Sequence, residues 1–95
     1  MAKKFWERED FDIALFVSVF NSVYNLCYDC VNMDDSKTMD AHCKDGDAMM
    51  YNAEIAPLVK MLSDYREDGL TSDRELATFA IVYGMFYNWA KSKED

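Results

Sequence analysis

The longest apolar stretch of the chain runs from Leu76 to Ala90, where only Thr78, Gly84 and Asn88 interrupt hydrophobic residues. A surface helix of a globular protein carries one apolar stripe and a polar opposite face. This stretch is hydrophobic on nearly all sides, which predicts a helix that other helices or a partner protein cover. It is too short to cross a bilayer, because a spanning helix takes about 20 apolar residues.

The start of this helix is marked by Ser72 and Glu75, which match the S-x-x-E capping box. We therefore expect the helix to begin at Ser72 and to run to about Lys91. A turn at Asp68–Thr71, which contains a glycine, separates it from the preceding element.

A first long helix is predicted over Phe11–Val31. Its apolar residues recur at spacings of three and four and face a narrow polar stripe; they are Ile13, Phe16, Val17, Phe20, Val23, Tyr24 and Cys27. We expect Asp10 to cap this helix and Asp12 to lie in its first turn, where a negative charge is favourable.

Between these helices we expect a loop and a second helix. Asn32–Asp47 is acidic and poor in apolar residues, which predicts a long loop with at most one helical turn near Met39–Lys44. Ala48–Glu67 has helical periodicity, but Pro57 removes a backbone hydrogen bond inside it. This proline predicts a kink near Ala53–Ala56, or two shorter helices that meet there.

Together these elements predict an all-α fold, a small three-helix bundle with a kinked second helix and a long acidic loop after the first helix. We expect residues 11–91 to form a single domain. Residues 1–10 would form an N-terminal arm that packs Phe5 and Trp6 onto this domain, and residues 92–95 would form a frayed tail.

Charge narrows the classes of partner. The chain has 18 acidic and 10 basic residues, a net charge of −8, which argues against direct contact with nucleic acid or with an anionic membrane. Acidity either keeps an apolar protein soluble or recognises a basic protein surface. For the second case, the predicted acidic surface consists of Asp34, Asp35, Asp40, Asp45 and Asp47.

The predicted localisation is cytoplasmic. The apolar run Ile13–Phe20 is short, follows several acidic residues and lacks a cleavage site, so it does not resemble a secretory signal. An odd number of cysteines, three, does not indicate a disulfide framework.

The cysteines raise an alternative hypothesis, a structural zinc site. Cys27 and Cys30 lie one helical turn apart, and His42 and Cys43 follow in the loop. Together they could supply the Cys₃His ligand set of a tetrahedral zinc site that staples a small domain. The competing interpretation is that these thiols are buried as small hydrophobic side chains.

A second alternative hypothesis is a calcium module, because Asp64–Glu75 resembles the EF-hand loop. Asp64 and Glu75 take the first and last ligand positions, and Gly69 takes the turn position. Asp68 takes the fifth position, but Arg66 stands at the third position, where an oxygen ligand should be, and the resemblance covers only this loop. A glycine turn followed by the capping box explains the same residues without calcium.

Two features of the last helix predict an interface. Ala80 and Gly84 are small residues one turn apart, which would let a helix approach closely, either within the fold or from a second copy. Tyr83, Tyr87 and Trp89 cover more than one side of the helix, so some of them should face a partner. We therefore expect a homodimer.

No motif indicates an enzyme, because the sole histidine lies beside a cysteine and no glycine-rich phosphate loop is present. A DNA-binding helix-turn-helix is also disfavoured, since the last helix exposes few basic residues. We expect a small acidic interaction protein that binds another protein. By analogy of composition it would be a virus- or plasmid-type inhibitor that occupies a basic nucleic-acid-binding site, as a mimic of the nucleic acid.

Overall fold

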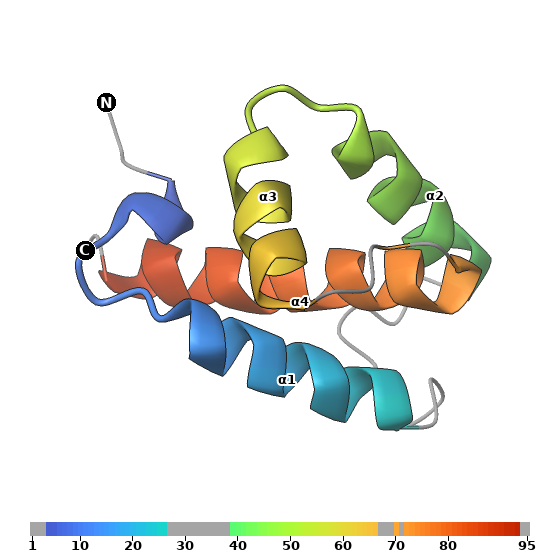
Figure 1. The fold of residues 1–95 in the computed structure, drawn as a ribbon, viewed down its shortest axis with the longest axis horizontal. Coiled ribbons are helices and arrows are strands. Elements are labelled where there is room, and N and C mark those ends of the chain that lie inside the picture. Colours follow the sequence, from blue (N-terminus) through green and yellow to red (C-terminus); the bar gives the residue numbers. More distant parts are fainter. Residues whose placement is uncertain (1–3, 27–38, 67–69, 71, 94–95) are drawn as a thin grey trace.

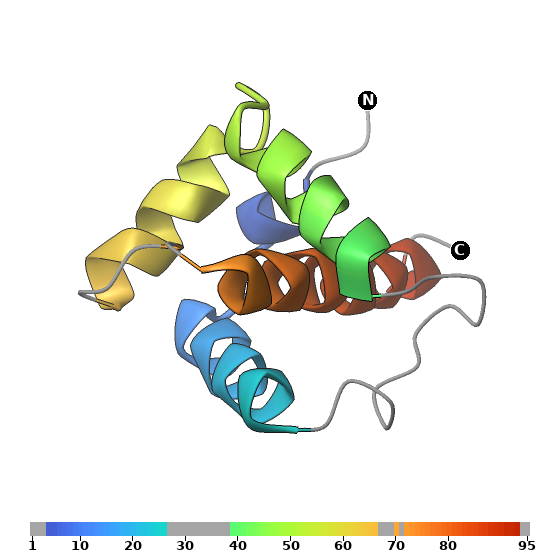
Figure 2. The same cartoon turned by 90° about the vertical axis from the view of Figure 1, so that its right-hand side faces the viewer.

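Helix α4 (Asp73–Lys93) is the centre of the fold in the computed structural model (Figure 1). Helix α1 (Ile13–Asn25) packs along one side of it and α2 (Met39–Met50) packs on another, while α3 (Ala56–Tyr65) packs against α1. In the view of Figure 2, α2 and α3 form an inverted V over α4, with α1 below. Other helices therefore cover most of the apolar stretch that stands out in the sequence.

The structure describes residues 4–26, 39–66, 70 and 72–93. Within these ranges the chain forms four α-helices and one 3₁₀ turn, η1 (Phe5–Glu7), and no strand. The all-α class is confirmed, but the prediction of three helices is wrong by one. Among the described residues, no helix is long and apolar enough to cross a membrane.

Helix α1 begins at Ile13, because Asp12, and not Asp10, is its N-cap. The Asp12 carboxylate accepts a hydrogen bond of 2.9 Å from the backbone N–H of Ala14, which satisfies one of the free amides at a helix start. The helix ends at Asn25, because its C-cap residue Leu26 has an extended backbone, so the prediction of one unbroken helix to Val31 is wrong. The remainder of the predicted helix, residues 27–31, lies outside the described residues.

The region predicted as a long loop contains helix α2, so the assignment of residues 39–47 to a loop is wrong. Gly46 explains how this polar helix packs. A Cβ atom placed on Gly46 would overlap the carbonyl oxygen of Leu76 and lie 2.6 Å from its carbonyl carbon. The missing side chain lets the α2 backbone lie directly on the first turns of α4.

The predicted second helix is divided into two, as one of the two sequence-based alternatives proposed. Helix α2 ends at Met50 and α3 starts at Ala56, with Ile55 as its N-cap residue. Pro57 lies in the first turn of α3, where its missing N–H costs nothing. The proline therefore starts a helix and does not kink one.

The capping box at the start of α4 is confirmed. The hydroxyl of Ser72 accepts a 3.1 Å hydrogen bond from the backbone N–H of Glu75, and the Glu75 carboxylate accepts one of 3.2 Å from the backbone N–H of Ser72. The helix extends to Lys93, slightly beyond the expected end.

Aromatic rings fill the core between η1, α1 and α4. Phe16 is fully buried, and its ring lies 4.9 Å from that of Phe86 and 6.2 Å from that of Phe79, centroid to centroid. Phe5 and Trp6 from η1 are buried against the same group. The N-terminal segment from Phe5 onwards is thus part of the core.

Every arginine of the chain lies over an aromatic ring. The guanidinium carbons of Arg8, Arg66 and Arg74 lie 5.5, 4.7 and 4.5 Å from the ring centroids of Trp89, Phe20 and Tyr24. Such cation–π contacts contribute about 0.5–1 kcal/mol each at exposed sites. They attach the first part of the chain, through α1, to α3 and α4.

Candidate functional site

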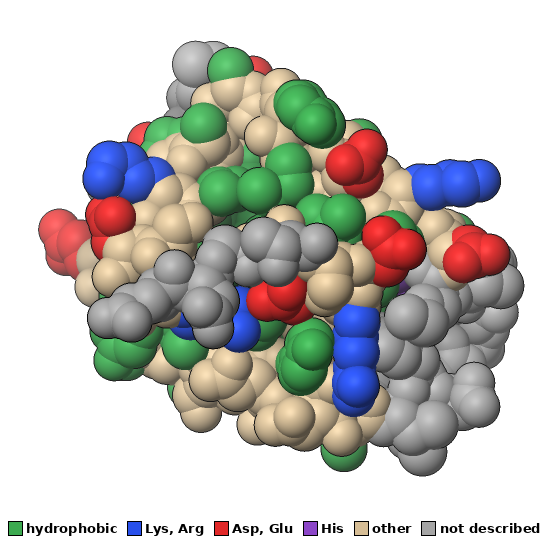
Figure 3. Space-filling view, turned by 45° about the vertical axis from the view of Figure 1, so that its right-hand side comes forward, with side chains coloured by type: hydrophobic (Ala, Val, Ile, Leu, Met, Phe, Trp, Pro, Cys, Tyr) green, Lys and Arg blue, Asp and Glu red, His purple; other side chains and the backbone are tan. Residues whose placement is uncertain are grey.

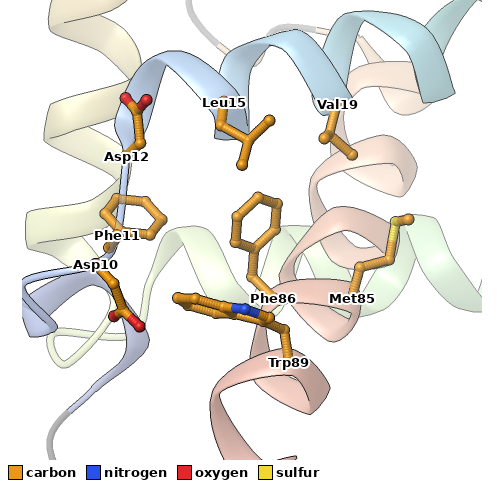
Figure 4. A pocket seen from close by; sticks show the side chains of 8 residues that line it. All are labelled: Asp10, Phe11, Asp12, Leu15, Val19, Met85, Phe86 and Trp89. Carbon is orange, nitrogen blue, oxygen red and sulfur yellow. The ribbon is translucent and has the colours of Figure 1, made fainter. Parts of the chain in front are cut away.

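An open apolar groove with a volume of about 210 Å³ lies between α1 and α4. We call it the α1–α4 groove; its lining residues, shown in Figure 4, are Asp10, Phe11, Asp12, Leu15, Val19, Met85, Phe86 and Trp89. Apart from the two aspartates, every lining side chain is hydrophobic. The groove is therefore suited to hold apolar groups.

Helix α1 supplies one wall through Leu15 and Val19. They lie four residues apart and so share one face of the helix, next to the face that buries Phe16 and Phe20. Leu15 is 54% exposed, and in Figure 4 both wall side chains point toward Phe86 and Met85. A leucine exposed to this degree gains stabilisation when a partner covers it.

Helix α4 supplies the opposite wall and the floor. Met85 and Trp89 are one turn apart on the helix, and Phe86 lies between them in sequence. The Phe86 ring lies 5.9 Å from Phe11 and 6.1 Å from Trp89, as well as on the core ring of Phe16. The floor is thus fixed by the aromatic core, so the groove is formed before any partner arrives.

One end of the groove is acidic. In Figure 4, Asp10 and Asp12 lie at this end on either side of Phe11, with their carboxylates pointing away from each other. The guanidinium of Arg8 donates to both oxygens of Asp10, from Nε at 2.9 Å and from Nη2 at 3.2 Å, and also lies over Trp89. The hydrogen bonds and charge of Arg8 lower the pKa of the Asp10 carboxyl below its ordinary value.

This ion pair gives a direct prediction for an NMR titration. A carboxyl whose pKa is lowered by folding stabilises the protein above its unfolded pKa, and this contribution is lost as the pH falls through the folded pKa. The midpoint for Asp10 should lie below 3.8 and should rise in Arg8→Ala, while Lys60→Ala, which removes a different exposed ion pair, leaves it unchanged. An identical midpoint in wild type and Arg8→Ala would contradict the observed pairing.

Of the residues predicted for an interface, only Trp89 lines the groove. Ala80 is buried inside the fold. A Cβ on Gly84 would meet nothing within 4 Å, so no helix of the described structure packs closely there. The rings of Tyr83 and Tyr87 stack with 6.4 Å between their centroids, and neither residue lines the groove. Tyr87 is 51% exposed. Burial raises the pKa of the Tyr83 hydroxyl.

The predicted acidic surface is divided. Asp34 and Asp35 lie outside the described residues, whereas Asp40, Asp45 and Asp47 lie on helix α2 and not on a loop. On the face shown in Figure 3, acidic side chains are scattered among hydrophobic and basic ones and form no continuous acidic surface there. The acidity of the protein is therefore not gathered on that face.

The proposed zinc ligands lie only in part within the described structure. Cys27 and Cys30 are outside it, and His42 and Cys43 are neighbours on α2. Partial burial, and then the nearby carboxylate of Asp73, raise the pKa of the Cys43 thiol, which disfavours the thiolate that binds metal. Within the described ranges, no group of three or more His, Cys, Asp or Glu residues could hold a metal ion.

In the EF-hand-like segment, the two end residues have structural partners. Asp64 pairs with Lys60 at 3.0 Å. Glu75 is buried; one carboxylate oxygen accepts from the Ser72 hydroxyl at 3.0 Å and the other lies 3.4 Å from Nη1 of Arg66. The intervening residues 67–69 and 71 are outside the described residues.

Sequence reasoning missed most of the groove. The helical pattern of α1 predicts a single core face, which leaves out Leu15 and Val19, and Met85 on α4 is not among the predicted interface residues either. The available signal was the width of its apolar arc, since Leu15 and Val19 extend beyond the residues that one face can bury.

Comparisons of this chain with protein-family models, with curated proteins and with solved structures gave no match.

Proposed function

We propose that this chain is a small, acidic, non-catalytic protein–protein interaction module, and that the α1–α4 groove is its binding site. The observation that carries the proposal is the groove itself, an apolar depression between two helices that is lined by the exposed Leu15 and the partly buried Trp89. Tryptophan is among the residues that contribute most to binding energy at protein interfaces.

The size of the groove favours side chains of a protein over a small molecule. Pockets for drug-sized ligands span about 300–1,000 Å³, whereas this groove has about 210 Å³ and is open to solvent. That volume suits a few apolar side chains of a docking segment. Covering them would contribute about 25 cal/mol for each Å² of apolar surface removed from water.

The charges support a protein partner over a nucleic acid. The net charge is −8, and the guanidinium groups that would contact phosphates are already held against aromatic rings of the same chain. An acidic protein of this kind is steered toward basic surfaces. Action as a virus- or plasmid-type inhibitor, or as a nucleic-acid mimic, stays a prediction from composition.

Affinity capture from extracts of the producing cells tests the proposal. Leu15 and Leu26 are exposed to a similar degree, 54% and 48%, but only Leu15 lines the groove. We expect wild type and Leu26→Gln to capture the same partner proteins, and we expect Leu15→Gln not to capture them. Both variants should fold, because exposed substitutions change stability by about 0.5 kcal/mol or less.

If Leu15→Gln retains the same proteins as wild type, the groove is not the binding site. Repeating the capture at high salt separates two classes of partner, because salt weakens contacts between exposed charges and leaves apolar docking intact. Capture that does not respond to salt would contradict nucleic-acid mimicry. A homodimer, the other predicted assembly, would appear in sedimentation as a mass that depends on concentration.

A further inference from the structure

We propose that the α1–α4 groove takes a segment of a protein partner in which bulky apolar side chains lie next to an arginine or lysine, and that this cation pairs with Asp12. The inference rests on the proposed function and adds the chemistry of the partner. It follows from the combination of an apolar floor with two carboxylates at one end.

Asp12 is the carboxylate with capacity for a further partner. Its Oδ1 atom accepts the backbone N–H of Ala14 at 2.9 Å, and the side chain is exposed. Within the described part of the chain, no lysine, arginine or histidine forms an ion pair with it. The second oxygen can therefore accept from a cation of the partner.

The neighbouring pair shows that this end of the groove accommodates a guanidinium. Arg8 lies between the carboxylate of Asp10 and the ring of Trp89, both of which line the groove. A second cation at Asp12 would lie at the same end, beside Phe11. The positive end of the α1 dipole partly offsets the charge of Asp12, so we expect a modest electrostatic contribution.

The same charges argue against a second copy of this chain as the occupant. In a symmetric dimer the same patch faces itself, which would bring Asp10 and Asp12 of both copies to one interface. Each copy also carries a net charge of −8. A basic segment of another protein would face neither the repulsion between aspartates nor the repulsion between two chains of like net charge.

A peptide titration tests the inference. The probe is a synthetic peptide with leucines next to one arginine, and its matched control carries citrulline, which has nearly the same shape without the charge. Binding is measured by calorimetry and by the NMR shift of the Met85 methyl group, which lies in the groove. We expect wild type to bind the arginine peptide about three- to tenfold more tightly.

Three variants separate the contributions of charge and apolar contact. Asp12→Asn removes the charge but keeps an N-cap of similar strength, and should abolish the preference for arginine. Asp47→Asn makes the same change in net charge on the exposed surface of α2, and should keep the preference. Leu15→Gln should lower the affinity for both peptides by about tenfold or more, because it removes a leucine that would be buried in the complex.

Other outcomes would overturn the inference in recognisable ways. If both peptides bind equally and Leu15→Gln weakens both, apolar docking stands and the role of Asp12 is refuted. If Asp12→Asn and Asp47→Asn reduce the preference equally, overall charge and not Asp12 selects the peptide. If neither peptide shifts the Met85 methyl group and Leu15→Gln captures the same cellular proteins as wild type, the proposed function fails together with the inference.

Discussion

Replacing Gly46 with alanine should destabilise the protein by about 3 kcal/mol, because the new methyl group would collide with backbone atoms of α4. The added Cβ would overlap the carbonyl oxygen of Leu76 and lie 2.6 Å from its carbonyl carbon. Backbone atoms at a helix crossing cannot rotate away as a flexible side chain can. Helix α2 would therefore have to move off α4, and the midpoint of urea denaturation should fall.

Gly84→Ala is the matched control for this experiment. Gly84 lies inside α4, and an added Cβ would meet nothing within 4 Å. Alanine exceeds glycine in helix propensity by about 1 kcal/mol, so this variant should be more stable than wild type. If Gly46→Ala were also as stable as wild type or more so, the close packing of α2 on α4 would be wrong.

Phe16→Ala should cost about 3–5 kcal/mol of unfolding free energy, the usual range for a fully buried phenylalanine. Its ring is inaccessible to solvent and lies between Phe5, Phe79 and Phe86. Phe86 also forms the groove floor, so the cavity left by the substitution should disturb the groove.

Leu15→Ala controls for the apolar change on the same helix. Leu15 is 54% exposed, and its truncation should alter stability by about 0.5 kcal/mol or less. The unfolding free energies of the two variants, obtained from their denaturation curves, should therefore differ by several kcal/mol. Similar curves would show that α1 packs with a different face toward α4.

The structure explains which elements the sequence could predict. Helix α4 and its capping box were predictable, because a nearly continuous apolar stretch and the Ser72–Glu75 pair are strong local signals. The first residues of α1 were predictable to within two positions, since either aspartate, Asp10 or Asp12, fits the cap. These features depend on residues close together in the chain.

Helix α2 was missed for a physical reason. Its sequence is acidic, contains a glycine and shows a weak apolar pattern, which local propensity assigns to a loop. Gly46 costs helix propensity in isolation but permits the backbone of α2 to lie on Leu76. That gain appears only when α4 is present, so no local pattern indicates it.

The groove was missed because it depends on how the helices share their apolar surface. Tyr83, Tyr87 and Trp89 predict an interface because they cover more than one side of α4, and of the three Trp89 lines the groove. The sequence alone does not show which apolar residues of α1 remain outside the core. Leu15 and Val19 line a groove only because α1 lies against α4.

Site-specific photo-crosslinking in the producing cells tests the assignment of the groove most directly. A benzophenone amino acid would replace Leu15 in the groove in one variant and Tyr65 on α3 in another, two positions with similar exposure, 54% and 56%. We predict that a protein partner crosslinks to position 15 and not to position 65. A partner that crosslinks to position 65 and not to position 15 would contradict the assignment of the groove as the binding site.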